Sequence, residues 1–129
     1  MKQTDNKIRV LVVEPGKTPY VKEIESGLKS LQREVGGYIE AVYPFEDRVA
    51  IICNEDGKNE GLQLNRALYD DAGEVYDIIA GTFLIAGLTD ENFGSLSEEL
   101  IEKYSERLCC PETFVKVDGR ITVLPRVVL

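Results

Sequence analysis

The chain has 129 residues, a length that fits one domain and suffices to bury a hydrophobic core. Its composition, 43% hydrophobic and 29% charged, is typical of a globular protein and excludes intrinsic disorder. A formal net charge of −8 argues against direct binding to a nucleic-acid backbone and favours a basic protein partner.

No apolar run reaches the roughly 20 residues needed to span a bilayer, and the first seven residues lack an apolar signal segment. We therefore expect a cytoplasmic protein without membrane contact. The cysteines fit that compartment, since Cys53 lies in an apolar run and Cys109 and Cys110 are adjacent. Without histidine or Cys-x-x-Cys spacing, the sequence offers no ligand set for structural zinc and no imidazole for catalysis, and we expect neither a metal nor a cofactor.

The first third of the chain predicts a hairpin followed by a helix. Residues 8–13 form an apolar run typical of a strand buried on both faces, residues 14–19 form a turn, and residues 20–24 return as a second strand. Ser26 is the expected N-cap of a helix whose buried stripe is Ile24, Leu28, Leu31 and Val35. The pair Gly36-Gly37 is the expected stop.

The middle of the chain predicts further strands. Residues 38–43 and 49–53 suggest a second hairpin, and Asp56-Gly57 is a tight-turn dipeptide. Residues 62–68 fit a short strand or a single helical turn, and the pattern does not decide between them. Residues 76–85 form the most apolar segment and are expected to be one central strand, in which Gly81 indicates a bulge or a close backbone approach.

The last third predicts a second helix and a third hairpin. Ser95 and Glu98 have the spacing of a capping box for a helix over residues 96–108, with a buried stripe that includes Leu100 and Tyr104. Residues 114–117 and 121–124 flank Asp118-Gly119, a hairpin signal. Strands in hairpins with two interleaved helices predict an α+β fold with a mainly antiparallel sheet, in a single domain over residues 1–129.

Two motifs that could bind ligands fail on their spacing. The Gly16-Lys17-Thr18 tripeptide follows a strand, but Leu11 stands where a phosphate-binding loop needs its first glycine. Counted from Asn54 as a calcium loop, Lys58 takes the fifth position, where an acid or amide is required. Both segments are therefore expected to be plain turns.

Polar residues at the ends of apolar segments form the candidate binding site. It comprises a turn, a pair on the following segment and one carboxylate: Asn54, Glu55, Asp56 and Lys58, then Asn65 and Arg66, then Asp77. Arginine is costly to bury unpaired, and Asp77 is its expected partner. The pair is either a structural ion pair or part of a clamp in which Arg66 binds an anion or a peptide carboxylate.

Two further groups of side chains have alternative interpretations. Four aromatic residues are expected to pack in the core, namely Tyr38, Tyr43, Phe45 and Tyr76. Four glutamates of the second helix form either a solvated face or a stripe that imitates DNA, namely Glu98, Glu99, Glu102 and Glu106.

Five segments together resemble an uncharacterised bacterial and phage family, "domain of unknown function 3846", over roughly residues 8–114. They are EPGK (14–17), VGGYIEAVYP (35–44), ICNEDGK (52–58), GLQLNRAL (61–68) and YDIIAGTF (76–83). The resemblance implies carriage on phages and conjugative elements, often beside anti-restriction genes. It implies no established activity and no catalytic residues.

Three functional hypotheses follow. The first is a small accessory protein of a mobile element that binds a protein partner through the candidate site. The second is an acidic decoy that imitates DNA and occupies a restriction enzyme. The third is an enzyme that depends on carboxylates or Mg²⁺, with an unknown reaction.

Overall fold

The computed structural model describes residues 7–124 and has an α+β fold, as the sequence predicts. Five strands form one antiparallel sheet in the order β2-β1-β7-β4-β3, and the short β8 pairs with β7. Their bounds are β1 Lys7–Val13, β2 Tyr20–Glu25, β3 Ile39–Val42, β4 Val49–Asn54, β7 Phe83–Leu88 and β8 Phe93–Gly94. Two separate two-stranded sheets pair β5 (Leu64–Tyr69) with β6 (Val75–Ala80), and β9 (Thr113–Val117) with β10 (Arg120–Leu124).

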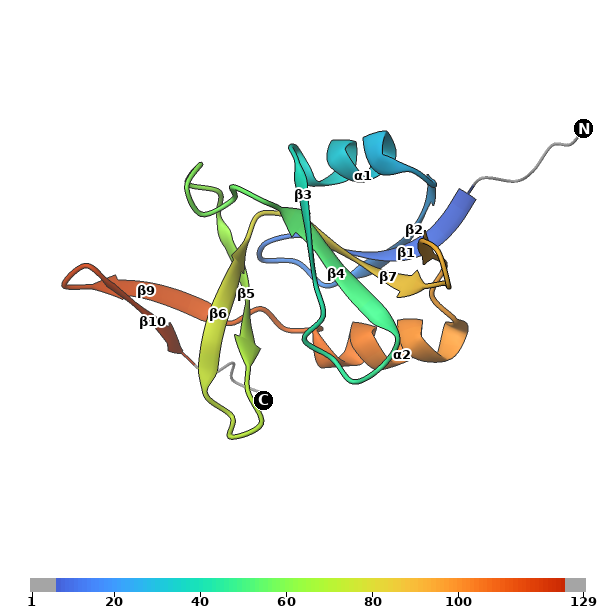
Figure 1. Ribbon diagram of the computed structural model, residues 1–129. Coiled ribbons are helices and arrows are strands. Elements are labelled where there is room, and N and C mark those ends of the chain that lie inside the picture. The colour runs from blue at the N-terminus through green and yellow to red at the C-terminus, as the bar shows by residue number, and fades with distance from the viewer. Residues whose placement is uncertain (1–6, 125–129) are drawn as a thin grey trace, which may run out of the picture.

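The main sheet separates two hydrophobic cores. Helix α1 (Leu28–Val35) packs on one face, where Leu31 and Val35 join the even-numbered side chains of β1 and β4. Helix α2 (Glu98–Arg107) lies on the opposite face, and Ile101 and Tyr104 are buried there (Figure 1). The β5–β6 hairpin contributes Leu68 and Ile79 to this second core. Every residue of β4 is buried because helices cover both faces of its sheet.

All three predicted hairpins are present. Strand β1 pairs with β2, and β3 with β4, as expected. Strands β9 and β10 are joined by Asp118 and Gly119, whose φ angles of 50° and 76° are those of a type I′ turn. Figure 1 shows this last hairpin projecting away from the main sheet.

The segment expected to be one central strand is two strands. It breaks at Gly81, with β6 before it and β7 after it, and only β7 is central to the sheet. Gly81 has φ +84°, and a Cβ atom there would lie 2.7 Å from Leu62 Cδ1. The expected close backbone approach is therefore present, but it redirects the chain instead of making a bulge within one strand.

The β4–β5 connection is a turn, as expected, but it joins strands of two different sheets. The Asp56-Gly57 turn does not close a hairpin, because β4 pairs with β3 and β7 whereas β5 pairs with β6. The undecided segment at residues 62–68 is mainly strand. It lies beyond a run of turns that carries the chain away from the main sheet.

Both predicted helix caps are displaced. Gly27, not Ser26, is the N-cap of α1, and Leu28 is exposed instead of lying in the buried stripe. The N-cap of α2 is Ser97, whose hydroxyl accepts a hydrogen bond from Leu100 N. Ser95 instead accepts a hydrogen bond from the backbone N–H of Arg9, and so ties the start of α2 to β1. The predicted stop at Gly36 is confirmed by its left-handed conformation.

Candidate functional site

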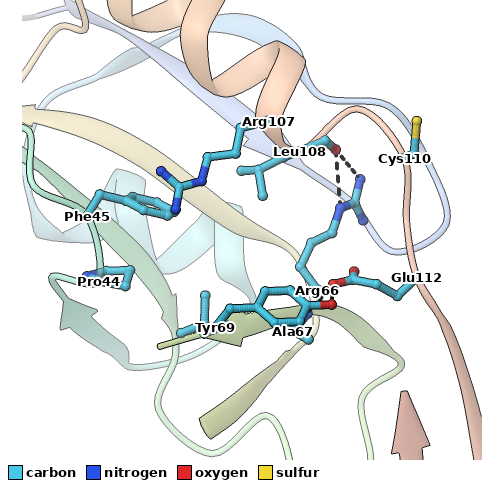
Figure 2. A pocket seen from close by; sticks show the side chains of 10 residues that line it. Pro44, Phe45, Arg66, Ala67, Tyr69, Arg107, Leu108, Cys110 and Glu112 are labelled. Atoms are coloured by element: carbon cyan, nitrogen blue, oxygen red, sulfur yellow. Dashed lines mark hydrogen bonds between the residues drawn. The ribbon is translucent and has the colours of Figure 1, made fainter. Parts of the chain in front are cut away.

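Arg66 lies inside the fold, on β5, with 1% of its surface exposed. Its guanidinium donates to the carbonyl of Leu108 from Nη2 at 2.9 Å and from Nε at 3.2 Å (Figure 2). Nη2 also donates to Lys17 O at 2.7 Å, and Nη1 to Asn65 Oδ1 at 2.7 Å. These bonds join the turn after β1 to the end of α2, so Arg66 is not presented to a partner.

Asn65 is fully buried and has a similar role. Its Nδ2 donates to Val13 O at 2.9 Å and to Gly81 O at 2.8 Å. The two carbonyls belong to the end of β1 and to the break between β6 and β7. Asn65 therefore fixes the β5–β6 hairpin to the main sheet.

The expected pairing of Arg66 with Asp77 is wrong. Asp77 Oδ1 lies 2.5 Å from Lys58 Nζ, and both side chains are about half exposed. Arg66 donates hydrogen bonds to the backbone carbonyls of Leu108 and Lys17. Every residue has a backbone carbonyl, so the sequence does not indicate which ones Arg66 will meet. The Lys58–Asp77 ion pair instead joins the turn after β4 to β6.

The turn residues at 54–58 divide into one buried and three exposed side chains. Asn54 is buried, donating from Nδ2 to Val35 O at 3.2 Å and accepting at Oδ1 from Asp56 N at 2.8 Å. It closes the end of α1 and shapes the turn. Glu55, Asp56 and Lys58 are exposed and available for contact.

A groove of about 250 Å³ lies between the β3–β4 hairpin and β6. We call it the acidic groove, because its charged lining consists of three carboxylates and one amine, those of Glu40, Glu55, Asp77 and Lys58. Burial, followed by the charges of Glu40 and Asp77, raises the pKa of the Cys53 thiol in its wall to about 11. This thiol is therefore protonated at neutral pH and is a poor nucleophile.

Three of the four aromatic residues expected in the core are exposed. Tyr38 and Tyr43 flank β3 and are 72% and 60% exposed, and Tyr76, beside Asp77 on β6, is 55% exposed. Of the four, only Phe45 packs against the core; it is partly buried, with its ring centroid 4.7 Å from that of Tyr104. The expectation of a core cluster was wrong: Tyr38 and Tyr43 flank the edge strand β3, beyond which no strand of residues 7–124 pairs, and Tyr76 lies on the separate β5–β6 sheet.

A second pocket, of about 330 Å³, lies between β5, the end of α2 and the loop after β3 (Figure 2). The guanidinium of Arg107 stacks over the Phe45 ring, 4.5 Å from its centroid. Glu112 Oε2 accepts hydrogen bonds from Tyr69 Oη at 2.8 Å and from Ala67 N at 3.3 Å. The other oxygen of Glu112, Oε1, is buried and has no hydrogen-bond partner among residues 7–124. No sequence signal marks this pocket, since its residues come from three distant segments.

Within residues 7–124, no group of three or more His, Cys, Asp or Glu side chains is placed to hold a metal ion. None of the helices described is long and apolar enough to cross a membrane. The exposed glutamates of α2 form a solvated face, in which Glu98 pairs with Arg9.

The fold and the acidic groove define a small α+β protein with a polar surface groove at the edge of an antiparallel sheet. Residues 8–109 match the domain of unknown function DUF3846, and the chain belongs to this family. The match ends before β9, five residues short of the boundary expected from the resemblance. No curated protein and no solved structure shows significant similarity to the chain.

Proposed function

We propose that this protein is a small accessory protein of a mobile genetic element and that it acts by binding another protein. The observation that carries the proposal is the exposure of Tyr38 and Tyr43 beside the acidic groove. Tyrosine is enriched at protein interfaces, because its ring supplies apolar contact area and its hydroxyl a hydrogen bond. The mobile-element setting rests on the family resemblance alone.

The partner surface in this proposal is the acidic groove with its tyrosine rim. Of the residues predicted from the sequence, Glu55, Lys58 and Asp77 line the groove with exposed side chains, and Asp56 is exposed on the adjoining turn. The side chains of Asn54, Asn65 and Arg66 are buried and are not part of the surface. The excess of carboxylates in the groove, together with the net charge of −8, favours a basic partner.

Affinity capture from a host lysate with two matched variants tests this function. Glu55→Lys reverses an exposed charge in the groove, and Glu102→Lys makes the same change on the exposed face of α2. We expect Glu55→Lys to reduce capture at least about tenfold, because it places a cation opposite a basic partner. Glu102→Lys should capture as the wild type does.

The reverse result would move the interaction to α2 and support the acidic decoy. That alternative has less support, because Arg9 neutralises Glu98 and because Lys103 and Arg107 lie on the same helix. If the wild type captures no protein at all, protein binding itself is wrong.

A further inference from the structure

Strand β3 is an edge of the main sheet. It pairs with β4 on one side, and no strand among residues 7–124 pairs with its other side. An edge strand presents a row of backbone N–H and C=O groups to which another chain can add as a further strand.

The hydrogen-bond register identifies the outward groups of β3. Glu55 N donates to Tyr38 O at 2.8 Å, so the backbone groups of residue 38 point toward β4. In an antiparallel ladder this direction alternates along the strand. The N–H and C=O groups of Ile39 and Ala41 therefore point outward, and those of Glu40 and Val42 point toward β4.

The opposite edge of the sheet, β2, is protected by charge, whereas β3 is not. Lys22, Glu23 and Glu25 lie within the six residues of β2. Charged side chains at this density oppose the addition of a further strand. Glu40 is the only charged residue of β3.

The side of β3 that carries Glu40 and Val42 lines the acidic groove. A strand added beside β3 would place every second side chain on this side of the sheet. Those side chains would lie beside Glu40, whose carboxylate favours lysine or arginine, whereas Asp77 is already paired with Lys58. The exposed rings of Tyr38 and Tyr43 stand at the two ends of β3, where they would contact the ends of an added segment.

We propose that an extended segment of the partner protein, with basic residues at alternate positions, adds to β3 and places its basic side chains in the acidic groove. This inference rests on the proposed protein-binding function and specifies the form of the partner.

Amide hydrogen exchange measured by NMR tests the inference on the intact protein. The probe is an acetylated and amidated hexapeptide of alternating lysine and valine, and its controls are alternating glutamate and valine and a block peptide of three lysines and three valines. In the free protein, the amides of Ile39 and Ala41 should exchange faster than those of Glu40 and Val42. The alternating basic peptide should slow exchange at Ile39 and Ala41 at least tenfold, and the controls should not.

Two variants separate the backbone from the charge contribution. Ala41→Pro removes one outward N–H without removing a bond to β4, and it should abolish the effect of the peptide. Glu40→Lys changes only an exposed side chain and brings the charge of the groove lining from −2 to 0, so the protection by the alternating basic peptide should fall at least tenfold. If Ala41→Pro does not fold, the proposal is still tested by the response of Glu40→Lys to the peptides and by the protection of Ile39 and Ala41 in the wild type.

Three results would overturn the proposal. The first is an absence of protection at Ile39 and Ala41 with millimolar basic peptide. The second is protection that rises with protein concentration without peptide, which would make a second copy of the chain the occupant. The third is equal capture of a lysate protein by wild type and Ala41→Pro, which would leave protein binding intact and exclude β3 as its site.

Discussion

The guanidinium of Arg66 stabilises the fold by donating hydrogen bonds to a buried and to a partly buried backbone carbonyl. It donates to Leu108 O at the end of α2 and to Lys17 O in the turn between β1 and β2, two groups far apart in sequence. A buried charge is tolerated where hydrogen bonds surround it. Removing one partner of a buried hydrogen bond leaves the other partner unpaired, and this costs free energy.

We expect Arg66→Ala to lower the free energy of unfolding by about 3 kcal/mol or more, because it removes two hydrogen bonds from the buried carbonyl of Leu108 and opens a cavity. Urea denaturation followed by circular dichroism measures the change. Lys58→Ala is the control, since this exposed lysine should change stability by less than about 1 kcal/mol. A loss below 1 kcal/mol for Arg66→Ala would contradict a structural role.

Two glycines with nearly the same positive φ angle allow the cost of backbone strain to be separated from the cost of steric contact. Gly81 has φ +84° and Gly73 has φ +81°, but only at Gly81 would an added Cβ meet another atom, Leu62 Cδ1 at 2.7 Å. Gly73→Ala should cost about 1 kcal/mol from backbone strain alone, and Gly81→Ala about 2–3 kcal/mol. Thermal unfolding of both variants measures the difference, and equal losses would show that Leu62 moves aside freely.

At the scale of elements, the two helices begin in different ways. Helix α2 has a side-chain cap, because Ser97 Oγ accepts from Leu100 N at 3.2 Å. Helix α1 has Gly27 as its N-cap and no side-chain cap hydrogen bond. The position of a serine near a helix start does not by itself decide whether its hydroxyl reaches the first turn.

Ser97→Ala should therefore destabilise the protein by about 1 kcal/mol, and Ser26→Ala should leave stability within about 0.5 kcal/mol of the wild type. Chemical denaturation of the two variants side by side measures both values. A similar loss of stability in both variants would show that Ser26 also caps its helix.

At the scale of the whole molecule, an acid-sensitive contact links α2 to the loop between β3 and β4. Asp47 Oδ2 accepts hydrogen bonds from Lys103 Nζ and Tyr104 Oη, each at 2.7 Å. The Lys103 ammonium and then the Tyr104 hydroxyl lower the pKa of Asp47. A carboxylate whose pKa is lower in the folded state contributes stability that is complete above its unfolded pKa of about 4 and is lost at lower pH.

We therefore expect the free energy of unfolding to fall as the pH decreases below about 4. Glu14 adds to this slope, because hydrogen bonds from Tyr20 and then Lys17 lower its pKa. Asp47→Asn should make the dependence shallower, as measured by urea denaturation at successive pH values. An unchanged slope in this variant would show that Asp47 does not contribute.

Local patterns were sufficient for most of the elements. Apolar segments and turn residues predicted all three hairpins, and helical spacing predicted Leu31, Val35 and Tyr104 as buried residues. These features depend on neighbours within about four residues, so the sequence displays them directly. The break at Gly81 was not predicted, because the apolar pattern continues through it on both sides.

The candidate site was predicted only in part, because partners in space decide whether a polar side chain faces solvent. Glu55, Asp56, Lys58 and Asp77 are exposed as a surface site requires, whereas Asn54, Asn65 and Arg66 are buried against backbone carbonyls. The position of such carbonyls depends on the packing of distant elements and leaves no local signal.

The sequence by itself determined the α+β class, the family and the excess of negative charge, since each depends on composition or on short-range order. Only the tertiary structure decided which strands form edges and which charged groups meet. It placed Arg66 in the interior and left β3, with its two flanking tyrosines, at the edge of the sheet beside the acidic groove. The physical reason is that strand order and burial arise from contacts between residues far apart in the chain.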